Sequence, residues 1–202
     1  MDVGVIGLGA MGLGMAQSLR RGGHAVSVCD LRAEIVEAFV ADGGHACANP
    51  TELAARCDVV VSVLVNLEQT EQVLFGRNGV AAAMRKGSVF VMCSTVPPEQ
   101  SRRLGERMAA MGLLYLDAPV SGGEQKATAG SLTFIVGGSQ AAQEAAAPAL
   151  ASMADHVFRV GEEAGAGSTV KLINQLLVAV HMATAAEAMG LARRQGIDLQ
   201  AL

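Results

Sequence analysis

A glycine-rich turn near the start of the chain is the feature that most constrains its fold. Residues 7–12 read Gly-Leu-Gly-Ala-Met-Gly, which places Gly7, Gly9 and Gly12 in a GxGxxG pattern. A β-branched run, Val3–Gly7, precedes the turn, and a stretch with helical spacing of Met, Leu and Ala follows it. A strand, a glycine turn and a helix in this order form the context in which the pattern binds a dinucleotide.

Each of the three glycines has a distinct predicted role. Gly7 permits the tight turn, Gly9 lets the backbone approach a pyrophosphate, and Gly12 allows the helix to pack closely on the strand. The first turn of the helix offers free N–H groups and a partial positive charge to the phosphates. We therefore predict a dinucleotide site at this turn.

The second apolar run ends at Asp30, and this position bears on which dinucleotide is bound. An acidic residue about 20 residues beyond the glycine turn holds the hydroxyls of the adenosine ribose and repels a 2′-phosphate. Asp30 therefore favours NAD over NADP. Arg32 leaves the alternative open, because an arginine nearby can accept that phosphate.

The first 160 or so residues alternate between short apolar runs and helix-like segments. Further Val- or Leu-rich runs follow at residues 25–29, 58–65, 88–93, 113–117 and 132–136. Runs with almost no polar alternation are typical of parallel strands that are covered on both faces. Strands that alternate with helices predict right-handed βαβ units and an α/β fold with a Rossmann-like doubly wound sheet.

The pattern changes after Gly161. Gly161, Gly165 and Gly167 suggest a flexible entrance, and a helical pattern then continues over residues 168–194 without a strand signal. We expect an NAD-binding domain at residues 1–162 and, at residues 163–202, the first long helix of an all-helical C-terminal domain. This apolar helix has nothing obvious to pack against, so we expect either a truncated chain or a partner protomer that covers it.

The carboxyl edge of the predicted sheet carries further candidates for cofactor binding. Leu64, Val65 and Asn66 end one strand there, and Thr95 follows another. Ligands of doubly wound sheets lie at this edge. Thr95 could donate to the nicotinamide or its ribose, or it could cap the following helix.

A second turn, Asp-Ala-Pro-Val-Ser-Gly-Gly at residues 117–123, follows another predicted strand. The backbone N–H groups of Gly122 and Gly123, together with the Ser121 hydroxyl, could hold a carboxylate. The same sequence is also compatible with an ordinary loop.

Lys171 is the candidate for acid–base chemistry. The chain has only three lysines but twelve arginines, and Lys171 lies among apolar residues near the start of the long helix. Residues three and four apart share a helix face, so Lys171, Asn174 and Gln175 form one polar patch. Burial would lower the lysine pKa toward the range of a general base. The alternative is a lysine whose stem packs on the helix while its amine reaches solvent.

Composition excludes several other classes of function. The net charge is −4 and charged residues make up 17% of the chain, which argues against binding of nucleic acid or of an anionic membrane. The long helix is interrupted by polar and charged side chains, so we interpret it as part of a soluble protein. No metal site is predicted, since the four histidines and four cysteines lack ligand spacing. Isolated apolar cysteines and the lack of a basic leader favour a reduced, cytoplasmic protein.

With these residues in view, the chain resembles the β-hydroxyacid dehydrogenases. The resemblance covers the whole chain and rests on the glycine turn, the 117–123 turn, and Gly165-Ala166-Gly167 leading to Lys171 and Asn174. The local sequences at residues 46–50, 69–76 and 173–177 are most similar to those of the L-threonate dehydrogenase branch. One departure is Ser18, where the family usually has asparagine.

The resemblance implies roles for individual residues. Lys171 would be the catalytic acid/base, Ser121, Gly122 and Gly123 would hold the substrate carboxylate, and Asn174 would orient the reacting group. It also implies a homodimer or homotetramer assembled through C-terminal helices, and a helical domain that extends beyond Leu202. The full set of residues predicted to bind the cofactor is Gly7, Leu8, Gly9, Ala10, Met11, Gly12, Asp30, Leu31, Arg32, Leu64, Val65, Asn66 and Thr95.

The predicted function is NAD-dependent oxidation of a small hydroxy acid. L-threonate or a related sugar acid is the first candidate, with 3-hydroxyisobutyrate and the pair D-glycerate and tartronate semialdehyde as alternatives. Two other readings remain open. One is a non-catalytic NAD-binding or oligomerisation module, and the other is a fragment that is inactive without the rest of the enzyme.

Overall fold

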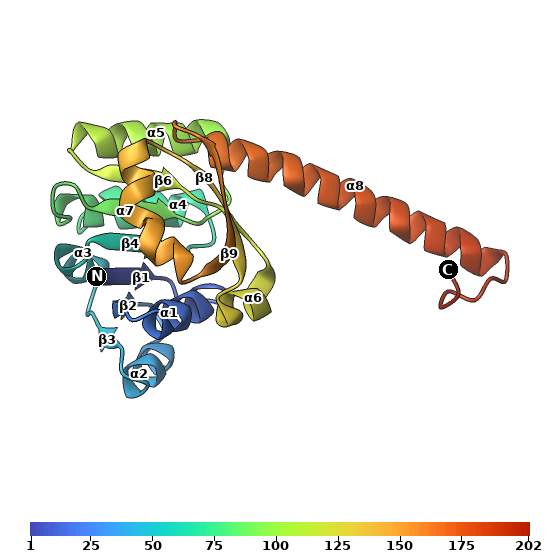
Figure 1. The fold of residues 1–202 in the computed structure, drawn as a ribbon, viewed down its shortest axis with the longest axis horizontal. Helices are drawn as coiled ribbons and strands as arrows, with labels where there is room; N and C mark the ends of the chain where they lie inside the picture. Colours follow the sequence, from blue (N-terminus) through green and yellow to red (C-terminus); the bar gives the residue numbers. More distant parts are fainter.

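The computed structural model describes residues 1–202 and contains one nine-stranded sheet with helices on both faces (Figure 1). The strands are β1 (Asp2–Ile6), β2 (Ala25–Cys29), β3 (His45–Ala46), β4 (Val59–Ser62), β5 (Val89–Met92), β6 (Leu114–Asp117), β7 (Val120–Ser121), β8 (Leu132–Gly137) and β9 (Ala154–Gly161). The helices are α1 (Gly12–Arg21), α2 (Ala33–Ala41), α3 (Pro50–Arg56), α4 (Leu67–Phe75), the 3₁₀ turn η1 (Val80–Ala82), α5 (Pro98–Ala110), α6 (Gly123–Ala129), α7 (Gln140–Ala151) and α8 (Ala166–Arg194).

The central part of the sheet is parallel and doubly wound, which confirms the predicted fold class. Strands β3, β2, β1, β4, β5 and β6 lie side by side in that order, all parallel. The order reverses at β1, which pairs with β2 on one side and β4 on the other. Ligands of such sheets bind outside the carboxyl ends of the strands at this reversal.

Two hydrophobic cores, one on each face, explain why the strands are apolar on both sides. Side chains of α1, α2, α6 and α7 cover one face, and side chains of α3, α4, η1 and α5 cover the other. Val59 and Val61 of β4 belong to the first core, whereas Val60 belongs to the second. This alternation is why the apolar runs show no polar period.

Beyond β6 the sheet becomes mixed, and the sequence did not predict this part correctly. β6 and β7 pair with successive parts of β8, at Gly137 and at Phe134 and Thr133, and both pairings are antiparallel. β9 pairs with the other side of β8. Strands β3, β7 and β9 were not predicted from the sequence, because β3 and β7 have two residues each and β9 is largely exposed.

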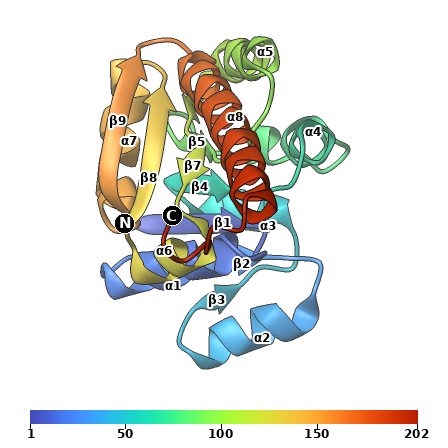
Figure 2. The ribbon, with the colours of Figure 1, turned by 90° about the vertical axis from the view of Figure 1, so that its right-hand side faces the viewer.

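Helix α8 leaves the body of the protein at its first turns and then extends into solvent (Figures 1 and 2). It is 29 residues long, and only Gly167, Ser168, Lys171 and Ala192 are buried. By length and apolar composition alone it could cross a membrane, the one helix of which this is true. In Figure 2 it runs toward the viewer from the side of the sheet on which β1 ends.

The glycines that lead into α8 are tightly packed, so the expectation of a flexible entrance was wrong. A Cβ on Gly167 would lie 2.5 Å from the Ile135 carbonyl oxygen, and one on Gly165 would lie 2.7 Å from that of Pro98. Gly165 also has a φ of +90°, which side chains disfavour. These glycines let the first turn of α8 approach the backbone of the sheet and of α5.

Candidate functional site

The glycine turn joins β1 to α1 with the geometry that the motif requires. Gly7 has a φ of +90°, and its N–H donates to the Cys29 carbonyl at 3.0 Å. A Cβ on Gly12 would lie 1.8 Å from the Gly7 carbonyl oxygen, whereas a Cβ on Gly9 would meet no atom within 4 Å. Gly12 therefore serves close packing, and Gly9 faces open space, as its predicted role beside a pyrophosphate requires. The Leu8 side chain is buried, while Ala10 is exposed and Met11 half-buried.

Asp30 lies directly beside this turn and has two sets of partners. Its Oδ2 accepts the Leu8 N–H at 2.6 Å, so the carboxylate also holds the glycine turn in place. Its Oδ1 accepts the Arg32 N–H and Nε–H, both at 2.9 Å, and Arg32 Nη2 donates to Oδ2 at 3.1 Å. These hydrogen bonds, led by the Arg32 side chain, lower the pKa of Asp30 to about 2. Leu31, between them, is fully exposed.

The pairing of Asp30 with Arg32 bears on the choice of dinucleotide. The guanidinium that could accept a 2′-phosphate is held by the carboxylate, and about half of the Arg32 side chain is exposed. The carboxylate itself is mostly covered. A ribose with free hydroxyls can share this carboxylate, whereas a 2′-phosphate has to approach an anion.

The neighbouring loops at the carboxyl edge are tied to one another. Leu64 approaches the glycine turn, since its Cδ2 lies 3.3 Å from a Cβ built on Gly7. Ser94 Oγ donates to the Leu64 carbonyl at 2.7 Å, a link that the sequence analysis did not assign. Asn66 caps α4 by accepting the Gln69 N–H at 2.9 Å, and Val65 is exposed.

Thr95 is exposed on the loop that follows β5, and the capping alternative for it is excluded. The N-cap of α5 is Pro97, and no side chain caps that helix. The Thr95 hydroxyl is therefore not committed to the helix and remains accessible at the edge where a dinucleotide would lie.

The 117–123 turn leads into α6, which packs on α1. A Cβ on Gly14 would lie 2.6 Å from the Thr128 backbone nitrogen, so only glycine allows this approach. Ser18 Oγ donates to the Ala127 carbonyl at 2.9 Å, which gives the departure from the family pattern a structural role. Gly122 and Gly123 both have positive φ, at +138° and +76°, and both are exposed.

Lys171 reaches this turn from α8. Its Nζ donates to the Val120 carbonyl at 2.9 Å and to Ser121 Oγ at 3.0 Å. The residue is 6% exposed, which excludes the alternative of an amine that reaches solvent. Because Ser121 Oγ accepts from Lys171, its own hydroxyl hydrogen is free to donate to a ligand.

Burial lowers the pKa of Lys171 from its ordinary value, and no charged neighbour offsets this effect. A lysine in such surroundings is neutral over a wider range of pH, and its lone pair can accept a proton. Asn174 lies on α8 three residues further on, half-buried, and Gln175 is exposed. The structure thus brings Lys171 to Ser121, with Asn174 on the adjoining turn.

Two residues near this site escaped the sequence analysis. Asp117 was noted only as the start of a turn, and Ser168 only as the start of the long helix. In the structure both are buried and hydrogen-bonded to each other, immediately before Ser121 and Lys171 in their respective segments. A carboxylate at the end of an apolar strand was the available signal for Asp117.

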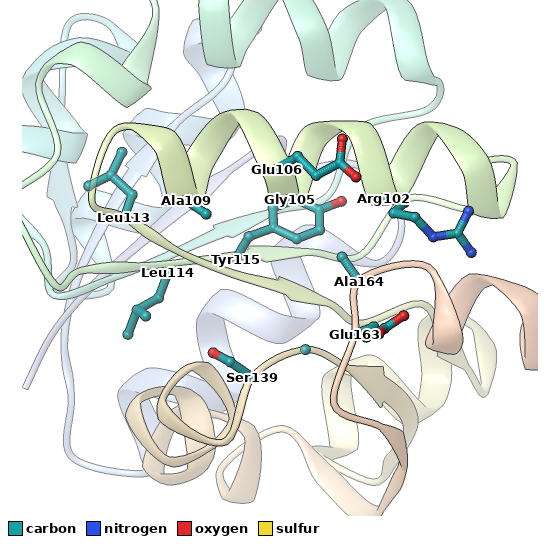
Figure 3. A pocket seen from close by; sticks show the side chains of 11 residues that line it. Arg102, Gly105, Glu106, Ala109, Leu113, Leu114, Tyr115, Ser139, Glu163 and Ala164 are labelled. Atoms are coloured by element: carbon teal, nitrogen blue, oxygen red, sulfur yellow. The ribbon is translucent and has the colours of Figure 1, made fainter.

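A cavity of about 410 Å³ lies elsewhere, between α5 and the loop that leads into α8 (Figure 3). Arg102, Glu106, Tyr115, Ser139 and Glu163 are among its lining residues. None of its lining residues belongs to the glycine turn or to the 117–123 turn, so the cavity is separate from the candidate site.

The cysteines do not offer a nucleophile. All four are free thiols, and three of them are buried. Burial raises the pKa of Cys29 to about 11 and that of Cys57 to about 12, so both thiols are protonated at neutral pH.

Comparison with protein-family models divides the chain into two matched parts. Residues 2–161 match the NAD-binding domain of 6-phosphogluconate dehydrogenase. Residues 165–202 match the family described as the NAD-binding part of NADP-dependent 3-hydroxyisobutyrate dehydrogenase.

Curated relatives match over nearly the whole chain. An L-threonate dehydrogenase from Cupriavidus necator is 53% identical over 201 residues, which cover 100% of this chain and 68% of the relative. A 3-hydroxyisobutyrate dehydrogenase from Pseudomonas aeruginosa is 38% identical and is covered over 66% of its length. The chain therefore spans about two thirds of the length of these relatives.

Solved structures show the same arrangement. A crystal structure of 3-hydroxyisobutyrate dehydrogenase from Salmonella typhimurium superposes with a TM-score of 0.91 at 42% identity, covering 100% of this chain and 70% of that one. A Mycobacterium tuberculosis 3-hydroxyisobutyrate dehydrogenase with L-serine has a TM-score of 0.91 at 33% identity, with 98% and 67% of the two chains covered.

The arrangement of Asp30 predicts the effect of its removal on dinucleotide choice. In Asp30→Ala, the affinity for NAD should fall by the value of charge-assisted hydrogen bonds to the ribose, about 1.5–3 kcal/mol. The affinity for NADP should fall less or rise, because Arg32 is released. Titration of each dinucleotide by fluorescence or calorimetry measures both constants. Asp58→Ala, at the opposite edge of the sheet, is the matched control, and a wild-type preference for NADP would contradict this assignment.

Proposed function

This chain belongs to the β-hydroxyacid dehydrogenases of the 3-hydroxyisobutyrate dehydrogenase type, and we propose that the hydroxy acid it oxidises with NAD is L-threonate or a closely related sugar acid. Relatives from several bacteria that bear the name L-threonate dehydrogenase match the full chain at 41–53% identity. Proteins that bear the name 3-hydroxyisobutyrate dehydrogenase are 38% and 42% identical to the chain, so the relative at 53% identity is the one that favours the L-threonate branch. The local sequences at residues 46–50 and 173–177 support the same L-threonate dehydrogenase branch.

The contact between Lys171 and Ser121 is the observation that carries the catalytic part of the proposal. It places a buried amine within 3.0 Å of a hydroxyl in the turn that we assign to the substrate carboxylate. A substrate bound by this turn would therefore present its own hydroxyl close to the amine. General bases act over this kind of distance.

Each residue of the site then has a defined task. The Ser121 hydroxyl and the backbone of Gly122 and Gly123 hold the carboxylate of the substrate, and Asn174 orients the hydroxyl that reacts. Neutral Lys171 takes the hydroxyl proton, and in the reverse direction its protonated form returns it. When bound, nicotinamide supplies the hydride acceptor that no side chain provides. The buried position of Lys171 keeps water away from the proton that moves.

We assign cofactor binding and acid–base chemistry to different parts of the chain. Residues 1–162 hold the dinucleotide through the glycine turn, Asp30 and the loops at residues 64–66 and 95. Residues 163–202 bring Lys171 and Asn174 to the substrate. NAD is the proposed dinucleotide because Asp30 both orders the turn and occupies Arg32.

A non-catalytic module that only binds NAD is the second candidate function. Such a module has no need of a buried lysine, because burying an amine costs free energy unless it is paired with a charge as well as hydrogen-bonded, and Lys171 has no charged partner. The two hydrogen bonds of Lys171 and its nearly complete burial therefore favour the enzyme.

We also propose that α8 assembles with other helices in a cytoplasmic homodimer or homotetramer. Large apolar side chains on the helix are exposed over most of its length, among them Leu172, Ile173, Leu176, Leu177, Val180 and Met182. Burial of this surface would contribute about 25 cal/mol per Å². Light scattering coupled to size exclusion should give the mass of two or four chains, and a monomer at micromolar concentration would contradict the proposal.

The substrate proposal is tested with a panel of hydroxy acids. The full-length protein is incubated with NAD and, in separate reactions, L-threonate, D-glycerate, 3-hydroxyisobutyrate and L-serine, and NADH absorbance is followed. We expect the highest kcat/KM with L-threonate. A site with hydrogen-bond partners for its extra hydroxyls disfavours 3-hydroxyisobutyrate, which lacks them and would leave those partners unpaired. A higher value for 3-hydroxyisobutyrate would move the chain to another branch. NAD binding without turnover of any compound would favour the non-catalytic module.

Removal of the amine tests the role of Lys171. Lys171→Ala should lower kcat by ~10²–10⁴-fold, the usual contribution of a general acid–base group, while NAD affinity stays unchanged. In the wild type, oxidation should rise with pH as Lys171 loses its proton, with a midpoint below the ordinary lysine pKa of about 10.4. This rise should be absent from the residual activity of the variant.

Lys86→Ala is the matched control, because Lys86 is exposed and lies just before β5 at the amino edge of the sheet. Its kcat and its pH profile should equal those of the wild type. Near wild-type turnover by Lys171→Ala would exclude Lys171 as the base.

A further inference from the structure

Asp117 is a buried carboxylate for which the proposed reaction has no direct use. It ends β6 and is 0% exposed. Charged side chains are almost never buried completely unless they are paired or hydrogen-bonded. The partners of Asp117 therefore indicate why it is there.

Both oxygens of the Asp117 carboxylate accept from one residue, Ser168. The Ser168 N–H donates to Oδ2 at 2.7 Å, and the Ser168 hydroxyl donates to Oδ1 at 2.7 Å. Ser168 is in the first turn of α8, where backbone N–H groups have no acceptor within the helix. A carboxylate from another element thus replaces the missing acceptor and also complements the positive end of the helix.

The first turn of α8 is also held sterically against the strands. A Cβ on Gly167 would lie 2.7 Å from the Asp117 carbonyl oxygen, so the backbone of α8 approaches that of β6 at the same point. Lys171, whose amine contacts Val120 and Ser121, follows three positions after Ser168. Segment 117–121 therefore contacts α8 at two successive points.

We propose that Asp117 is a positioning residue for Lys171. By accepting both hydrogen bonds from Ser168, it fixes the rotation and height of α8 so that the amine of Lys171 meets Ser121 within the protein. The inference rests on the proposed function only for its kinetic consequence, because the placement of the amine is a property of the fold.

Few charged or titratable groups lie around Asp117 and Lys171. Cys93 and Tyr115 face Asp117, and burial raises the pKa of both, so they are neutral beside it. Burial likewise raises the pKa of Asp117, and hydrogen bonds from Ser168, from the Ser101 side chain and from the Gly165 backbone oppose this. Near Lys171, the charged side chains on α6 are Glu124 and Lys126, both exposed. On α5, Glu99 and Arg102 pair with each other at 3.0 Å.

Three variants of the full-length protein separate positioning from the effect of charge. Asp117→Asn keeps the shape of the side chain but offers only one acceptor oxygen. Ser168→Ala removes the hydroxyl bond, keeps the backbone bond and leaves the carboxylate in place, so it is the milder change. The double variant shows whether the two residues act through each other, because coupled residues give non-additive effects.

The first readout does not require turnover. Competitive labelling with acetic anhydride over a range of pH, followed by peptide mass spectrometry, reports the access and the pKa of Lys171. Lys86 and Lys126 serve as internal references. In Asp117→Asn we expect faster labelling of Lys171 and a rise of its pKa toward that of a solvated amine, with both references unchanged.

The direction of the change in the Lys171 pKa distinguishes a positioning role of Asp117 from a purely electrostatic one. Loss of position exposes the amine and raises its pKa, whereas loss of a nearby negative charge alone would lower it. An unchanged or lowered Lys171 pKa in Asp117→Asn, with unchanged labelling rates, would overturn the proposal. Additive effects of Asp117→Asn and Ser168→Ala would overturn it as well.

The second readout uses the substrate that the panel identifies. A misplacement of about 1 Å costs ~10²-fold in rate, so kcat should fall to that extent in Asp117→Asn. NAD affinity should not change, because the glycine turn is a separate contact, and this also shows that the variant is folded. The pH at half-maximal oxidation should move upward with the Lys171 pKa. If no compound is turned over, the proposed function fails, and the labelling result still decides the role of Asp117.

Discussion

Parallel strand pairing is the constraint on which the rest of the structure depends. It aligns the carboxyl ends of β1, β2, β4 and β5 along one edge of the sheet, so that loops distant in sequence meet there. The glycine turn follows β1, Asp30 follows β2, and Thr95 follows β5. The hydrogen bond from the Leu8 N–H to Asp30 shows how close this edge brings them. The predicted dinucleotide site is a consequence of the pairing rather than of any single motif.

The sequence predicts this part of the fold well because its signals are local. A glycine turn between an apolar run and a helix requires only adjacent residues, and the β-branched runs are long enough to be recognised as buried strands. The short strands β3 and β7 have no comparable signal, since each has only two residues. β9 was missed because its exposed residues follow no apolar pattern, and only its pairing with β8 defines it.

The candidate site was predictable in its residue types but not in its contacts. Lys171 was a candidate for acid–base chemistry because lysine is rare in this chain, yet the sequence left open whether its amine reaches solvent. The answer depends on Val120 and Ser121, about fifty residues away in the chain. Asp117 posed the same difficulty, because its partner Ser168 is equally distant. Gly165 and Gly167 were misread as flexible because close contact with another backbone cannot be inferred from glycine alone.

Helix α8 combines two different environments, and the boundary between them has a consequence for the chemistry. Its first turns are fixed by Ser168, Gly167 and Lys171 against the strands, whereas nearly all of the following residues are exposed. The contacts that place the Lys171 amine therefore lie between the first turns of α8, segment 117–121 and the start of α5 at Pro98. Whatever packs on the exposed part of α8 can complete the substrate pocket or the assembly, but it is not needed to bring the amine to Ser121. The position of the proposed base and the recognition of the far end of the substrate are thus separate physical problems in this fold.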